Sequence, residues 1–114
     1  MIPVKDILIA LRYRIGDTEK AEWSDDELLR VIGEVAQALR WRIRWHWNLD
    51  EDPVDLFTIV EGELDLDPSL QSAFVACLLS YLSGDPMRQA FDEVEFVRDY
   101  TTWKNPDLVM ELPW

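Results

Sequence analysis

Helix-start signals constrain the fold of this chain more than any other feature of its sequence. Ser24 precedes Glu27 by three residues, so the serine oxygen can accept a helix N–H while Glu27 reaches back to the serine N–H. Asp67-Pro68 and Asp85-Pro86 each place a capping carboxylate before a proline, which suits the first helical position because no N–H is needed there. These signals predict helices that begin near residues 25, 68 and 86.

The spacing of apolar residues agrees with these starts and adds a helix over residues 3–15, which ends at Gly16. The second helix is predicted from residue 25 to at least 43. The third is apolar nearly all round, which favours a central position, and it ends at Gly84. The predicted inward stripe of the fourth helix is Met87, Ala90, Phe91, Val94 and Val97. The fold class expected is mainly α: a small four-helix bundle with one short extended segment and an irregular C-terminal tail.

Two segments leave alternatives open. Residues 40–47 alternate between polar and apolar side chains, as a half-buried strand does, although continuation of the second helix is favoured. Residues 56–66 are partly β-branched and predict one short extended segment, and a sheet has no second candidate strand unless 40–47 supplies it. We expect one helical domain over 1–103 and a C-terminal docking tail over 104–114.

Composition excludes several classes of function. The chain is 48% hydrophobic over 114 residues, which is enough apolar material for one self-sufficient core. A net charge of −12 opposes binding to nucleic acid phosphates, and residues 58–114, at −8, are more acidic than residues 1–57, at −4. There is no pattern of a secretory signal, and the longest charge-free stretch, 68–84, is too short to span a bilayer.

The sequence offers little for catalysis or metal binding. Cys77 lies within an apolar run and is interpreted as a core thiol. His46, the single histidine, has no nucleophile or metal ligand in a recognisable relation to it, and the acidic clusters match no calcium loop. Glycine-rich phosphate loops are also missing from the sequence. We therefore expect a protein that is not an enzyme and has no catalytic residue, cofactor or metal.

Aromatic residues that the predicted core stripes leave out are the informative feature. At about 100° per residue, they give the second and fourth helices a second apolar face. Arg40, Arg42 and Arg44 interleave with Trp41 and Trp45, which favours stacking and salt bridges to an acidic neighbour. Either the loop and tail fold over these faces, or the faces dock on another subunit. The candidate interface residues are Val31, Ala38, Trp41, Arg42, Arg44, Trp45, Phe96, Tyr100, Trp103, Met110 and Trp114.

The N-terminal half resembles the head-to-tail connector proteins of tailed bacteriophages, also called adaptor or head completion proteins. The resemblance covers about 40 residues and lies in two segments, Leu11-Arg12-Tyr13-Arg14-Ile15-Gly16-Asp17 and Trp23-Ser24-Asp25-Asp26-Glu27-Leu28-Leu29. It implies a virion structural protein of the phage neck, assembled in the host cytoplasm. Such a protein would form a ring, expected to be twelve-fold, between the portal protein and a tail or stopper protein. An acidic channel wall would let DNA pass without specific binding.

Two other classes remain as alternatives. A small acidic inhibitor that mimics DNA would use the −12 charge to occupy a basic groove, although six tryptophans serve such a surface poorly. An enzyme that works through carboxylates and a metal is the weaker third reading. The resemblance and the aromatic faces favour the connector.

Overall fold

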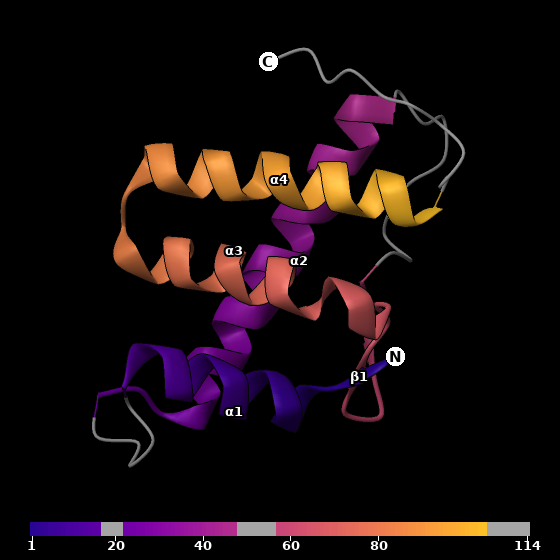
Figure 1. The fold of residues 1–114 in the computed structure, drawn as a ribbon. Helices are drawn as coiled ribbons and strands as arrows, with labels where there is room; N and C mark the ends of the chain where they lie inside the picture. The colour runs from indigo at the N-terminus through magenta and orange to yellow at the C-terminus, as the bar shows by residue number, and fades with distance from the viewer. Residues whose placement is uncertain (17–21, 48–56, 105–114) are drawn as a thin grey trace.

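A computed structural model describes residues 1–16, 22–47 and 57–104, and it is mainly helical with a small sheet, as the sequence predicts (Figure 1). A 3-10 turn over Pro68–Leu70 leads into the third helix. The elements are β1 (Ile2–Pro3), α1 (Val4–Ile15), α2 (Asp25–Trp47), β2 (Ile59–Val60), β3 (Glu63–Leu64), α3 (Gln71–Ser83) and α4 (Pro86–Lys104).

Side-chain caps begin the helices where the sequence places them. The Ser24 hydroxyl oxygen accepts the Glu27 N–H at 3.1 Å, and the Glu27 carboxylate accepts from the same hydroxyl. Asp67 accepts the Ser69 N–H at 3.0 Å, and Asp85 accepts the Met87 N–H at the same distance. These three starts are confirmed, because each cap satisfies a helix N–H that has no partner within the helix.

Glycines end two helices. Gly16 after α1 and Gly84 after α3 both adopt φ of 72°, the left-handed conformation that glycine takes without a Cβ penalty. The turn at Gly84 leaves only Asp85 before α4 starts, so α3 and α4 form a tight antiparallel hairpin. The sequence interpretation of both stops is confirmed.

Three helices form a layer that the fourth crosses. α3 lies between α1 and α4, and α2 runs across the other side of all three (Figure 1). α3 therefore occupies the centre, as its nearly continuous apolar surface predicts. None of the helices in the described part of the chain is both long enough and apolar enough to cross a bilayer.

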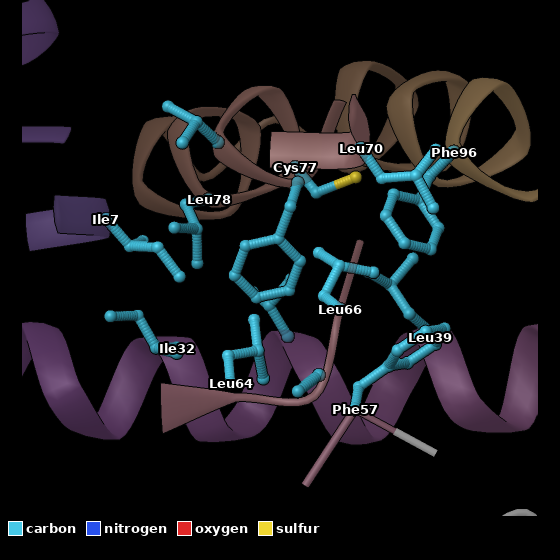
Figure 2. Packing of buried hydrophobic residues seen from close by; sticks show 14 of the residues in the cluster. Ile7, Ile32, Leu39, Phe57, Leu64, Leu66, Leu70, Cys77, Leu78 and Phe96 are labelled. Carbon is cyan, nitrogen blue, oxygen red and sulfur yellow. The ribbon is translucent and has the colours of Figure 1, made fainter. Parts of the chain in front are cut away.

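The core fills the space between α2 and the layer. Ile32 of α2 and Leu78 of α3 lie on opposite sides of this space, and Leu64 and Leu66 lie between the two helices (Figure 2). Full burial of an aliphatic or aromatic side chain contributes roughly 1.5–3 kcal/mol. The largest apolar side chains that are fully buried are Ile2, Ile7, Leu11, Leu28, Ile32, Leu39, Ile43, Leu64, Phe74, Leu78 and Phe96.

The extended segment is a hairpin rather than a single strand. Two residues, Glu61 and Gly62, link β2 to β3 with φ of 53° and 77°, a pair of positive values typical of tight two-residue turns. β3 also pairs with β1, so the sheet order is β1-β3-β2. The second partner thus comes from Ile2–Pro3, of which the sequence interpretation assigned Pro3 to the first turn of the first helix.

The predicted orientation of α4 is wrong. Met87 and Phe91, predicted to point inward, are 84% and 63% exposed, whereas Phe96 and Tyr100 are buried. The Phe96 ring meets Phe57 edge-on at 5.5 Å between centroids and Phe74 at 6.3 Å. Val97 is buried as predicted. The aromatic side turns inward because these rings bury more area and find aromatic partners on other elements.

Candidate interaction surface

The C-terminal end of α2 carries exposed tryptophans. Residues 40–47 continue the helix, so the strand alternative is wrong. Trp41 and Trp45 are four residues apart and therefore share one side of the helix. Their exposed fractions are 44% and 84%. In Figure 1 the last turns of α2 extend past α4, which carries this end of the helix away from the core.

The two tryptophans border a shallow hollow of about 400 Å³, lined also by Ala38 and Arg42. The hollow is flanked by a half-buried small side chain and two large rings. Exposed apolar surface of this kind, with aromatic side chains and an arginine, is typical of protein interfaces. We call these four residues the α2-end surface.

The three arginines of this region have different contacts. The Arg44 guanidinium carbon lies 5.1 Å from the centre of the Trp41 ring, a cation–π arrangement. Arg42 donates from Nε to Glu93 Oε2 of α4 at 2.8 Å, and its side chain stays 42% exposed. Arg40 donates to the Phe57 carbonyl oxygen at 3.5 Å. Arg42 and Arg40 therefore hold α2 in place, while Arg44 supports the Trp41 ring.

The interface prediction is wrong for three of the candidate residues, because they belong to the chain's own core. Val31, Phe96 and Tyr100 are buried. Val31 lies three residues after Leu28 and four before Val35, so it extends the inward face of α2. Phe96 and Tyr100 both contact Phe57, which lies just before β2 in the chain.

The remaining candidates divide between exposed and undescribed positions. Trp103 is 48% exposed at the end of α4 and contacts Tyr100 at 5.8 Å between ring centroids. Met110 and Trp114 lie outside the described residues, as does nearly all of the predicted docking tail. The sequence prediction missed Met87 and Phe91, whose i, i+4 spacing marks a common face but gives no sign of which way it points.

Arg12 has a structural role that the sequence interpretation did not assign. Its guanidinium is buried and donates to the Trp23 carbonyl oxygen at 2.8 Å and to Asp25 Oδ1 at 2.7 Å. These bonds join the end of α1 to the start of α2. Arg12 and Asp25 come from the two segments that carry the connector resemblance, so the structure brings these segments together.

Described side chains with catalytic potential are few. Cys77 is buried, and its Sγ lies 3.3 Å from the Asp92 carbonyl oxygen. Burial, followed by the charges of Asp92 and Glu93, raises the pKa of Cys77 to about 12, so the thiolate is disfavoured at neutral pH. Within residues 1–16, 22–47 and 57–104, no three His, Cys, Asp or Glu side chains form a metal-binding group. His46 lies on α2, but its side chain is not among those that the structure describes.

Comparison with known proteins identifies no relative. No family model, no curated protein and no solved structure matches the chain.

Proposed function

We propose that this protein is a structural adaptor that docks onto other protein subunits through the α2-end surface. The observation that carries the proposal is Trp45, whose indole is 84% exposed at the end of a helix that is otherwise firmly packed. Removing the apolar surface of an indole from water is favourable, so a partner that covers this ring gains binding free energy. Trp41, held by Arg44, extends the same surface.

The most specific form of this function is a head-to-tail connector of a phage neck, a ring of copies between portal and tail proteins. The resemblance in the N-terminal half supports it, and so does the pairing of its two segments by Arg12. A mainly helical domain with an apolar end surface suits a ring subunit, because ring contacts join two different faces of one chain. The acidic remainder suits a channel wall that repels DNA phosphates.

Light scattering coupled to size-exclusion chromatography tests the proposal, with and without the portal protein encoded in the same genome. The wild-type chain should form a ring or a complex with portal. Trp45→Ala should reduce complex formation at least tenfold, because central aromatic residues dominate interface energies.

Phe91→Ala is the matched control, since Phe91 is an exposed aromatic residue on α4. It should leave assembly unchanged if the α2-end surface is the docking site. A chain that stays monomeric, ignores portal and instead binds a nuclease would contradict the connector and favour the acidic inhibitor. Equal losses in both variants would contradict the assignment to α2.

A further inference from the structure

A small pocket lies where the segments on either side of the hairpin meet the C-terminal end of α4, and it shares no lining residue with the α2-end surface. Its volume is about 110 Å³, which matches the tip of one long side chain rather than a cofactor. Three aromatic residues, two acidic residues and one leucine line it: Phe57, Tyr100, Trp103, Asp65, Asp67 and Leu66.

The aromatic rings form a fixed wall. Phe57 and Tyr100 meet edge to face, with centroids 5.5 Å apart and planes at 88°. Trp103 is tilted by 43° against Tyr100 at 5.8 Å. Phe57 and Tyr100 are buried, while Trp103 is about half exposed and forms the accessible side. The face of an aromatic ring carries negative potential, which attracts a cation that reaches it.

The acidic residues are held in place by their neighbours. The Asp65 N–H donates to the Thr58 carbonyl oxygen at 2.8 Å, which fixes that residue beside the hairpin. The Asp67 carboxylate accepts the Ser69 N–H at 3.0 Å as the cap of the following turn. Hydrogen bonds from the Ser69 side chain and backbone lower the pKa of Asp67, so it is charged at neutral pH. Negative charge therefore lies next to the aromatic wall.

Lys104 shows that this wall accepts a cation. Its Nζ lies 5.7 Å from the centre of the Tyr100 ring and 3.4 Å from the Tyr100 hydroxyl oxygen. Lys104 is not among the described residues that line the pocket. The Tyr100 ring thus already attracts an ammonium from within the chain.

We propose that this pocket binds the side chain of an arginine presented by a partner protein. A guanidinium is planar, stacks on aromatic rings and pairs with carboxylates, so it suits both parts of the lining better than an ammonium does. The inference does not depend on the connector function, since it needs only a partner with an exposed arginine.

An NMR titration of the ¹⁵N-labelled full chain tests the pocket with Nα-acetyl-arginine amide, whose only charge is on the side chain. The indole N–H signal of Trp103, assigned with Trp103→Phe, should shift with a dissociation constant on the order of millimolar, as the small ligand size implies. The neutral isostere Nα-acetyl-citrulline amide should bind at least about fivefold more weakly, because it lacks the charge.

Substitutions locate the charge that the ligand recognises. Asp65→Asn combined with Asp67→Asn should weaken binding at least about fivefold, and asparagine still caps the turn, so the fold is retained. Asp26→Asn, which removes a carboxylate from the first turn of α2 that does not line the pocket, should leave binding unchanged. Thermal melting of each variant verifies that it is folded.

Three outcomes would overturn the proposal. Equal binding of the citrulline analogue would make the pocket an apolar hollow without cation recognition. Equal losses of ligand affinity in Asp26→Asn and in the double variant would show that binding depends on the overall charge of the protein and not on the pocket carboxylates. Binding of free arginine more than tenfold tighter than the blocked amide would identify a site for the free amino acid rather than for a protein side chain.

Discussion

α2 and α4 are the two longest helices in the part of the chain that the structure describes, and each carries apolar residues on two sides. On α2 the aliphatic stripe of Leu28, Ile32 and Leu39 faces the core, and Trp41 and Trp45 face outward. On α4 the aromatic residues Phe96 and Tyr100 face the core instead. The same sequence argument therefore gives the correct orientation for one helix, whereas the other is rotated so that only Val97 of its predicted inward stripe is buried.

The difference shows what an apolar pattern can determine. The α2 stripe is long and continuous, so only one rotation of the helix buries it. On α4 the two apolar sides are of similar extent, and the choice depends on Phe57 and Phe74, which lie on distant segments. Periodicity fixes a helix rotation only when one side clearly buries more apolar area than the other.

The largest expected effect on stability comes from Phe96 of α4, and Phe91 of the same helix is its control. Phe96→Ala should lower the free energy of unfolding by about 3–5 kcal/mol, because it leaves a cavity among Phe57 and Phe74. Phe91→Ala should change it by less than about 0.5 kcal/mol, since the ring is exposed. Urea denaturation measures both values. The reverse order would show that α4 packs with the side predicted from the sequence.

The reactivity of Cys77 sharpens the same comparison, because this thiol lies between α3 and α4. Alkylation at pH 8 should require opening of the structure and should be about a hundredfold faster in Phe96→Ala, from the loss of roughly 3 kcal/mol. Phe91→Ala should react like the wild type. Mass spectrometry of the labelled chain over time gives the rates, and rapid labelling of the wild type would contradict the burial of this thiol.

The pKa of Cys77 also predicts a pH effect on stability. The folded-state pKa of about 12 lies above the ordinary value of 9.0, so folding favours the protonated thiol. This contribution is complete below pH 9 and is lost as the pH rises towards 12. Cys77→Ala should therefore flatten the decline of unfolding free energy in that range, and an unchanged slope would contradict the shift.

A smaller effect is expected at the salt bridge that joins the two helices. Arg42→Ala should cost about 1 kcal/mol, because the 2.8 Å bond to Glu93 is partly buried. A double-mutant cycle with Glu93→Ala isolates the interaction. The pair Arg30 and Glu34, exposed and 3.9 Å apart on α2, is the control and should show a coupling of at most about 0.5 kcal/mol.

The smallest effect is expected at the α2-end surface. Trp45→Ala should change the unfolding free energy of the isolated chain by less than about 0.5 kcal/mol, because the ring makes few contacts to lose. Thermal or urea denaturation measures it. A loss above about 2 kcal/mol would place Trp45 in the core of the chain.

Local signals in the sequence predict the helix ends well. Caps such as Ser24 and Asp67 act within three residues of their targets, so the sequence alone contains the whole interaction. The sheet escapes prediction because its strands are two residues long and one of them, Ile2–Pro3, adjoins the first helix. No hydrophobic period can be detected in so short a segment.

The α2-end surface could be predicted from the sequence in part, because its two tryptophans lie on one helix. Trp41 and Trp45 are found because they lie opposite a dominant stripe on their own helix. The pocket beside Phe57 and the α4 orientation depend on contacts between residues far apart in sequence, for which the pattern along one helix contains no information. Arg12 is missed for the same reason, since its partners belong to the next segment of chain.

The central position of α3 has a consequence for how the molecule opens. Because α3 packs against α1, α2 and α4, no neighbouring helix can detach without uncovering part of it, and its own release requires all three to separate. Backbone amide protons of α3 should therefore exchange with deuterium last, and only through complete unfolding. Their exchange rates in native conditions give a direct reading of the global stability of the domain.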